Sequence, residues 1–198
     1  MIIYESNLCF EFSEESEVVK FDDTSFYRNY FNKLPNAKGI DFIVNSQEKL
    51  LFMEVKNCLG HENDNRWRLS TDNRKVNTAP TSVDTTNRES LDVEVAKKIG
   101  MTFSCLMGSH SKKGNCLAAE ELEEYFKASI DSKIFQDRKN VWILLLLEGN
   151  FASRTRSKKM VMKSLKDSIK TKLKWLNCKV DVVDLETYRE AIFDFKVV

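Results

Sequence analysis

The chain has 198 residues, of which 42% are hydrophobic and 31% are charged, and its formal net charge at pH 7 is +1. This length and composition predict a single globular domain over residues 1–198 and exclude a largely disordered chain. Because the net charge is close to zero, an acidic or basic partner has to be inferred from local charge.

The cysteines and the apolar runs indicate the compartment. Five cysteines are widely spaced and form no C-x-x-C pair, which predicts free thiols in a reducing environment. The longest apolar run, residues 141–147, is too short to span a bilayer, and the sequence shows no signal-like segment. We therefore expect a cytoplasmic protein that does not contact membranes.

The amino-terminal part predicts two strands and a helix. Segments 8–12 and 18–21 are apolar and β-type, and a polar turn separates them. A helix is expected over residues 24–34, where Pro35 ends it. Aromatic side chains recur along this helix at helical spacing, and we assign that stripe to the core.

A β-hairpin is predicted over residues 38–56. Two apolar, β-type runs flank a polar turn at residues 45–49. Symmetric pairing about this turn places Ile43 opposite Phe52 and Asn45 opposite Leu50.

Three charged residues, Asp41, Glu54 and Lys56, interrupt the apolar pattern of the hairpin. The same pairing places Asp41 opposite Glu54, where two like charges about 4.5–5.5 Å apart disfavour the sheet unless something compensates them. Mg²⁺ does so naturally, because it prefers oxygen ligands and is usually held by one or two carboxylates with water and phosphate. Lys56 lies two residues beyond Glu54 and so shares its face of the strand.

This constellation predicts phosphodiester hydrolysis, with a metal-activated water as nucleophile and Lys56 as the cationic donor. The alternative is a cluster of ion pairs on the surface of an edge hairpin. Both faces of the strands are otherwise apolar, which favours charges that point into a buried region.

Asp41, Glu54 and Lys56 resemble the motif of the PD-(D/E)xK nucleases, the restriction-endonuclease-like family, with Ile40 where that family often has proline. The resemblance implies an α/β domain with a mixed central sheet flanked by helices. It implies Mg²⁺ or Mn²⁺ bound by Asp41, Glu54 and the backbone carbonyl of Val55. It also implies a nucleic-acid partner, with DNA favoured over RNA. The expected role is in restriction, anti-phage defence or repair, as a homodimer or in a larger complex.

Many members of that family supply another acid from the helix before the hairpin, and residues 24–40 contain none. Glu17, Asp22 and Asp23 are the candidates for it. For Asp23 the alternative is a role as helix N-cap, which Thr24 could also fill.

A second acid-x-lysine pair, Asp194 and Lys196, is a rival location for the site, with Asp181 or Asp184 as its partner acid. The residues between these partners and the pair are expected to form a helix over 186–193, which makes it the weaker location.

Residues 60–89 are polar and lack periodicity. A loop of this length inside a compact domain is unusual unless it is functional or mobile. Trp67, between two arginines, is its one recognition-like feature, either as a packing anchor or as a base-stacking platform.

The next helix is expected over residues 90–106, directly after the motif strand and the loop. Lys98 on this helix is a candidate phosphate contact, with an ion pair to Glu94 four residues earlier as the alternative. A second, mostly solvated helix is expected over 118–135. The run at 141–147 predicts a central strand that is buried on both faces.

The region 154–179 holds ten Lys or Arg residues against one Asp. Its apolar residues over 157–176 recur every three or four positions, which predicts an amphipathic helix with its lysines outward. The economical partner is a nucleic-acid backbone, with anionic lipid or an acidic protein as alternatives. The candidate contacts are Lys159, Lys163, Lys166 and Lys170. A strand over 180–183 follows this helix.

The sequence therefore predicts a metal-dependent nuclease that hydrolyses phosphodiester bonds in DNA. The alternative is a non-catalytic subunit that keeps the fold and binds nucleic acid or docks to a partner. Metal-dependent cleavage distinguishes the two hypotheses.

Overall fold

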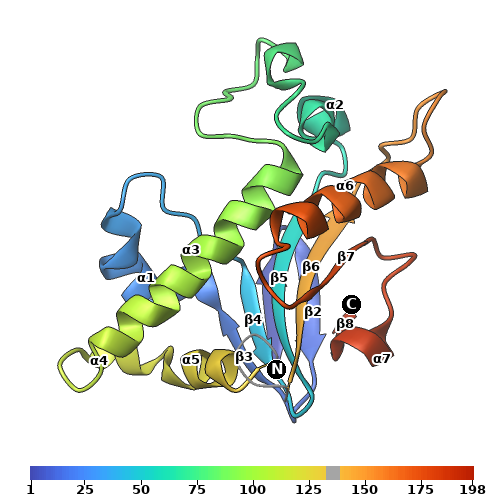
Figure 1. The fold of residues 1–198 in the computed structure, drawn as a ribbon. Helices are drawn as coiled ribbons and strands as arrows, with labels where there is room; N and C mark the ends of the chain where they lie inside the picture. Colours follow the sequence, from blue (N-terminus) through green and yellow to red (C-terminus); the bar gives the residue numbers. More distant parts are fainter. Residues whose placement is uncertain (133–138) are drawn as a thin grey trace.

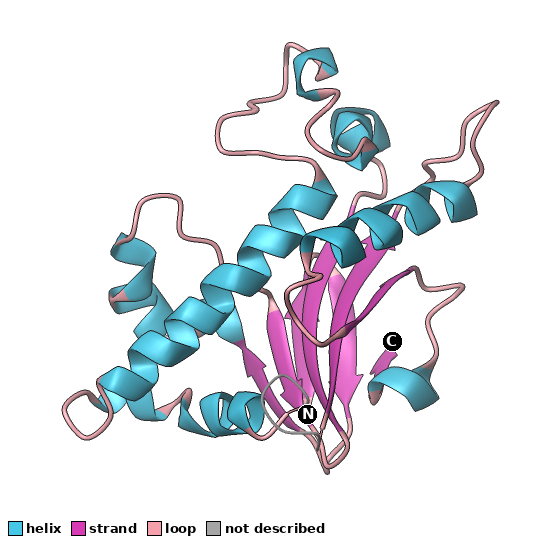
Figure 2. Ribbon diagram, in the orientation of Figure 1, coloured by secondary structure: helices cyan, strands magenta, loops and turns pink. Residues whose placement is uncertain are grey.

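The computed structural model describes residues 1–132 and 139–198, which form two β-sheets and a set of helices (Figure 1, Figure 2). The larger sheet has five strands in the order β3-β4-β5-β6-β7, and the smaller has three in the order β1-β2-β8. The strands are β1 (Ile2–Glu5), β2 (Leu8–Phe12), β3 (Glu17–Lys20), β4 (Phe42–Asn45), β5 (Lys49–Asn57), β6 (Asn140–Glu148), β7 (Lys179–Val183) and β8 (Phe195–Val197).

Helices of very different length connect these strands. The α-helices are α1 (Ser25–Asn29), α2 (Glu62–Asn65), α3 (Leu91–Ser111), α4 (Leu117–Glu120), α5 (Glu123–Ile130), α6 (Lys158–Lys172) and α7 (Glu190–Phe193). The 3-10 turns are η1 (Phe21–Asp23), η2 (Phe31–Lys33), η3 (Arg66–Leu69) and η4 (Val76–Thr78).

Strand pairing in the five-stranded sheet uses both directions. β4 is antiparallel to β3 and β5, while β6 runs parallel to β5 and β7. The β4–β5 hairpin has the predicted register, with Ile43 opposite Phe52 and Asn45 opposite Leu50. The predicted α/β class, the mixed sheet and the central strand, β6, are therefore confirmed.

The two faces of this sheet pack against different layers because side chains alternate along each strand. On β5, Leu50 and Phe52 belong to the core beneath α3, α5 and α6. Leu51, Met53 and Val55 belong to the core shared with the three-stranded sheet. Full burial of one such side chain stabilises the fold by about 1.5–3 kcal/mol. Alternate residues of β5 therefore stabilise the packing of both layers against the sheet.

α3 crosses the helix-covered face of the sheet beside α6 (Figure 1). Leu91, Val95 and Ile99 recur at helical spacing on its buried side. The helix continues to Ser111, past its predicted end at residue 106. Its first half lies over β5, because Glu94 and Lys98 of this half contact Lys56 and Glu54 of that strand.

The predicted helix over 24–34 is wrong in its length. α1 ends at Asn29, and the separate turn η2 follows it. Tyr30 and Leu34 are exposed while Phe26 is buried. The aromatic stripe reaches the core only in part, because the chain does not continue as one helix.

The predicted helix over 118–135 is divided into α4 and α5, and residues 133–135 lie outside the described part of the chain. Leu122, Tyr125 and Phe126 are buried in the core beneath the helices. The prediction that this segment is mostly solvated is therefore wrong. Charged residues such as Glu124 and Lys127 are exposed, but the opposite face of the segment is apolar and buried.

Residues 60–89 contain α2, η3 and η4, so this polar segment is not a structureless loop. Trp67 lies in η3 and is buried. It is a packing anchor, and the base-stacking alternative is wrong because the ring is not accessible.

The remaining elements follow the predicted pattern with shifted ends. The predicted strands at 8–12, 18–21 and 180–183 correspond to β2, β3 and β7. α6 begins after Ser157, whose Oγ accepts a hydrogen bond of 3.3 Å from the Met160 N–H, and ends at Lys172 rather than at residue 176. Only α7 forms from the predicted helix over 186–193.

Two further predictions concern the thiols and the membrane. All five cysteines are free thiols, as predicted. In the described ranges no helix combines the length and the apolar character needed to cross a membrane.

Candidate active site

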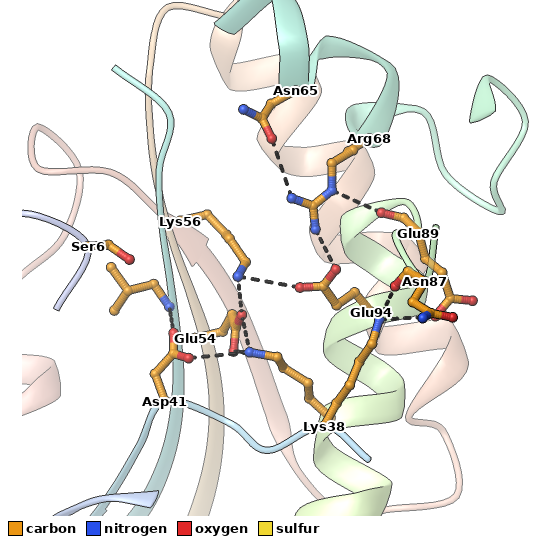
Figure 3. A network of polar contacts seen from close by, with 12 residues as sticks. Ser6, Lys38, Asp41, Glu54, Lys56, Asn65, Arg68, Asn87, Glu89 and Glu94 are labelled. Atoms are coloured by element: carbon orange, nitrogen blue, oxygen red, sulfur yellow. Dashed lines mark hydrogen bonds and ion pairs between the residues drawn. The ribbon is translucent and has the colours of Figure 1, made fainter. Parts of the chain in front are cut away.

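Asp41, Glu54 and Lys56 lie together beneath the first half of α3 (Figure 3). Glu54 and Lys56 continue the row of Leu50 and Phe52 on the helix-covered face of β5. Asp41 immediately precedes β4, and the alternation from Ile43 turns it to the same face. Two strands thus deliver all three residues of the motif to one side of the sheet.

Asp41 lies just beyond the β4–β5 ladder, so Asp41 and Glu54 do not form a ladder pair. That ladder ends at Phe42 and Met53, and Asp41 Oδ2 accepts a hydrogen bond of 2.7 Å from the Val55 N–H. The N–H and C=O groups of one strand residue point to the same edge, so the Val55 carbonyl is directed to this edge as well. The carboxylates of Asp41 and Glu54 therefore meet where β4 begins beside β5, at the edge to which the Val55 carbonyl is directed.

Lys98 reaches this place from α3. Its Nζ lies 3.3 Å from Asp41 Oδ1 and 2.7 and 2.8 Å from the two carboxylate oxygens of Glu54. The alternative of an ion pair between Lys98 and Glu94 is wrong, because the two buried carboxylates beneath the helix hold the ammonium instead.

Glu94 and Arg68, which no sequence pattern assigned to the site, complete the cluster. Lys56 Nζ lies 2.7 Å from Glu54 Oε1 and 3.4 Å from Glu94 Oε1. Arg68 Nη2 donates to the other oxygen of Glu94, and Arg68 Nε donates to the backbone carbonyl of Glu89 at 3.0 Å. Arg68 thereby ties the polar segment 60–89 to the site.

A helical signal for Glu94 does exist in the sequence. It precedes Lys98 by four residues, so both lie on the same face of α3. Arg68 has no comparable signal, because an irregular segment separates it from both the strand and the helix.

Burial and charge shift the titration of Asp41 and Lys98. Burial, together with the neighbouring Glu54, raises the pKa of Asp41 to about 7 against the opposing charge of Lys98. For Lys98, burial disfavours the ammonium, but the carboxylates of Glu54 and Asp41 outweigh this and raise its pKa above the ordinary value. Lys98 is therefore charged at neutral pH, whereas Asp41 titrates near neutral pH.

Glu94 and Lys56 are ionised at neutral pH as well. Burial opposes the charge of Glu94, but the cations of Lys56 and Arg68 lower its pKa to about 2. Burial likewise opposes the charge of Lys56, but the carboxylates of Glu54, Glu94 and Asp41 together outweigh it, so that the pKa of Lys56 is raised.

A cavity of about 840 Å³ opens above the cluster, between the segment that contains α1 and the segment 60–89. Lys56, Glu94 and Lys98 line it. Asp41 and Glu54 are only 5% and 0% exposed and do not line it. The two lysines thus separate the two acids from the cavity.

The three candidates for a further acid have different surroundings. Glu17 accepts a hydrogen bond of 2.7 Å from Asn45 at the far end of β4, away from the cluster. Asp23 is engaged by a lysine and an arginine, and Thr24 is the N-cap of α1, so the N-cap role of Asp23 is wrong. Asp22 lines the cavity, and burial, with the adjacent Asp23, raises its pKa. Asp22 therefore stays the candidate.

The basic helix α6 does not reach this cavity, since none of its residues lines it. Lys166 Nζ pairs with Asp181 at 2.9 Å, and other lysines of α6 pair with Asp184 and Asp92. Within the described chain, the lysines of α6 that are exposed and form no ion pair are Lys159, Lys163 and Lys170. The structure thus brings Lys98 to the motif residues and leaves the other predicted contacts on a separate surface.

The rival location at the carboxyl end is not assembled. Asp194 pairs with Lys49 at 2.9 Å, and Lys196 with Glu190 at 3.4 Å. Lysines of α6 engage the two acids that were its candidate partners. This alternative is wrong, because each of its members is paired with a different residue.

The donor atoms at the motif are oxygens, the type of ligand that a hard divalent cation prefers. Among the described residues, no three His, Cys, Asp or Glu side chains form a ready-made metal group. The predicted set is smaller, with the carboxylates of Asp41 and Glu54 and the carbonyl of Val55, and Mg²⁺ is usually held by one or two carboxylates with water and phosphate. The ammonium of Lys98 contacts both carboxylates and so stands where such a cation would bind.

Fold and site together define an α/β protein with a mixed five-stranded sheet and a largely buried cluster of three carboxylates and three cations between this sheet and α3. The chain belongs to the family of unknown function DUF6661, whose family model matches residues 24–198. Comparison with curated proteins found no match, and comparison with solved structures found none.

Proposed function

We propose that this protein is a metal-dependent nuclease that hydrolyses phosphodiester bonds, with DNA as its substrate, on a restriction-endonuclease-like sheet. One observation carries the proposal. Asp41 and Glu54 share one cation, the Lys98 ammonium, next to the backbone of Val55, whose N–H donates a hydrogen bond to Asp41. Two acids that hold a cation beside a third oxygen donor and a strand-mate lysine match the arrangement that the PD-(D/E)xK resemblance implies.

In this proposal Asp41, Glu54 and the Val55 carbonyl hold Mg²⁺ or Mn²⁺. Such a cation, when bound, neutralises charge on the phosphate and lowers the pKa of a water molecule. Lys56 donates hydrogen bonds to the attacking water or to a phosphate oxygen. Its ammonium is already held between Glu54 and Glu94, so its orientation does not depend on substrate.

Arg68 and Glu94 act through Lys56 and are positioning residues. Glu94 is charged at neutral pH because Lys56 and Arg68 hold its pKa at about 2. Arg68 fixes the carboxylate of Glu94 from the opposite side. Glu94, held in this way, is a second carboxylate partner of the Lys56 ammonium beside Glu54.

The decisive experiment is a cleavage assay with the purified protein. Labelled single-stranded and duplex DNA and RNA are incubated with Mg²⁺, Mn²⁺ or EDTA. Cleavage that needs the metal is expected, and Asp41→Asn, Glu54→Gln and Lys56→Met are each expected to abolish it. Lys127→Met is the matched control, because this exposed lysine on α5 pairs with Glu124 and lies away from the cluster.

A non-catalytic subunit is the second candidate, and one observation favours it. Asp41 and Glu54 are buried and already neutralised by lysines, as in a purely structural cluster. Nucleic-acid binding without any metal-dependent cleavage would establish this alternative. Residual cleavage by all three variants at the level of the control would instead reveal a contaminating nuclease.

A further inference from the structure

Lys98 reaches the two acids from α3, so its side chain can move without disturbing the sheet. It comes from α3, whereas Asp41, Glu54 and Lys56 are fixed by the two strands of the hairpin. Its ammonium lies between the two acids, but its side chain also lines the cavity. Four flexible methylene groups connect the ammonium to the helix, so a change of rotamer can carry it from the acids into the cavity.

When Asp41 is ionised, the charges of the cluster balance. Asp41, Glu54 and Glu94 face the cations of Lys56, Lys98 and Arg68. A divalent cation that entered alone would bring two positive charges into a buried place where Lys98 already occupies the carboxylates. A phosphodiester that entered alone would find Lys56 and Lys98 engaged by acids. Each ligand alone meets a cost that their joint arrival removes.

We propose, on the basis of the nuclease function above, that Lys98 is a second lysine that contacts the substrate, and that it does so only when a divalent cation is bound. In the metal-free protein it is the counter-ion of Asp41 and Glu54, and when a divalent cation takes that place it moves onto the scissile phosphodiester. The cation and the substrate phosphate therefore bind interdependently.

Linkage makes this interdependence measurable from both sides. If the phosphodiester strengthens cation binding by some factor, the cation strengthens phosphodiester binding by the same factor. Such couplings are typically about 5–150-fold. Removal of the Lys98 ammonium should tighten cation binding in the absence of substrate, because nothing then has to be displaced, and should abolish the coupling.

The experiment measures Mn²⁺ binding by the electron paramagnetic resonance signal of free Mn²⁺, which does not require turnover. Wild type, Lys98→Met and Lys98→Gln are titrated with and without a phosphorothioate-linked oligonucleotide that resists hydrolysis. Lys97→Met is the matched control, because the neighbouring lysine pairs with Glu89 outside the cluster. Asp41→Asn reports whether the cation binds at the two acids. Thermal melts in EDTA verify that each variant is folded, and Lys98→Gln keeps a hydrogen-bond donor between the acids.

We expect the wild type and Lys97→Met to bind Mn²⁺ at least about fivefold more tightly with the oligonucleotide than without it. Both Lys98 variants should bind Mn²⁺ more tightly than wild type without the oligonucleotide and show no coupling. Wild-type affinity and coupling in the Lys98 variants, with Mn²⁺ binding lost in Asp41→Asn, would overturn the role of Lys98 and leave the nuclease site intact. Unchanged Mn²⁺ binding in Asp41→Asn would overturn both proposals.

Discussion

Lysines occupy two contrasting regions of this molecule. Beneath α3, Lys56 and Lys98 are partly buried and contact the carboxylates of Asp41, Glu54 and Glu94. On α6, lysines dominate the sequence, yet part of them pair with acids of the neighbouring elements and the rest are exposed. The number of lysines in a segment therefore says little about their state. What decides it is whether the fold brings a carboxylate to a place that water does not reach.

The strongest test of this contrast removes the acid at the centre of the cluster. Glu54 is fully buried and contacts both Lys56 and Lys98. Removing one partner of a buried ion pair typically costs about 3–5 kcal/mol, so Glu54→Ala should lower the free energy of unfolding by that order. Lys163→Ala on the exposed arc of α6 should change it by no more than about 0.5 kcal/mol. Urea unfolding followed by tryptophan fluorescence measures both, and equal values would show that the cluster is not buried.

A second test makes the same comparison between two arginines of the segment 60–89. Arg68 is buried and holds Glu94, whereas the side chain of Arg74 is 73% exposed and pairs with Asp72 at the surface. Arg68→Ala leaves Glu94 with one cation fewer and should destabilise the protein by about 3 kcal/mol. Arg74→Ala should be nearly neutral, because exposed ion pairs contribute little. Similar losses in the two variants would mean that Arg68 contributes as a surface residue.

Strand periodicity in the sequence was enough to locate one part of the site. A period of two and a symmetric hairpin placed Asp41, Glu54 and Lys56 on one face. They could not reveal Arg68, because its contact with Glu94 depends on how an irregular segment folds back over α3. Glu94 itself was seen only as the local partner of Lys98, since a helical ion pair is the default when the residues beneath a helix are unknown.

The same limit explains the errors in the fold. Apolar, β-type runs identified β2, β4, β5 and β6, where burial of one or both faces imposes a clear pattern. The segment that forms α4 and α5 is rich in charge, and its apolar face was missed because the partner surface comes from the far end of α3 and from β4. Pairing between β2 and β8 joins the two ends of the chain, which no local pattern reports.

The pH dependence of stability gives a third test, centred on Glu94. Its pKa is about 2 in the folded protein and 4.5 ordinarily, so the unfolded chain binds the proton at a higher pH. The stabilisation is therefore fully present above pH 4.5 and is lost as the pH falls toward 2. The shift corresponds to an upper limit on the order of 3 kcal/mol. Glu94→Gln should lack this loss, which urea melts at pH 6, 4 and 3 measure. A parallel decline in both proteins would assign acid sensitivity to other carboxyls.

The weakest effect on the fold, and the sharpest on binding, is expected at α6. Lys159, Lys163 and Lys170 are exposed, whereas Lys166 is held by Asp181. For every phosphate of duplex DNA that a protein no longer neutralises, the slope of log affinity against log salt becomes shallower by about 0.9. Replacing the three exposed lysines with Gln should therefore reduce the slope by about 2.7, while Lys166→Gln should change it little because its charge is already paired.

Binding is measured in EDTA, so that no cleavage intervenes, by fluorescence anisotropy over a range of salt concentrations. Unfolding free energy should stay within about 0.5 kcal/mol of wild type for each exposed substitution, which separates binding from folding. An unchanged salt slope in the triple variant would assign the exposed arc of α6 to an acidic protein partner. If Lys166→Gln alone makes the slope shallower by the full value for one phosphate contact, about 0.9, its ion pair with Asp181 opens on DNA. Pairing within the chain would then not remove a lysine from the binding surface.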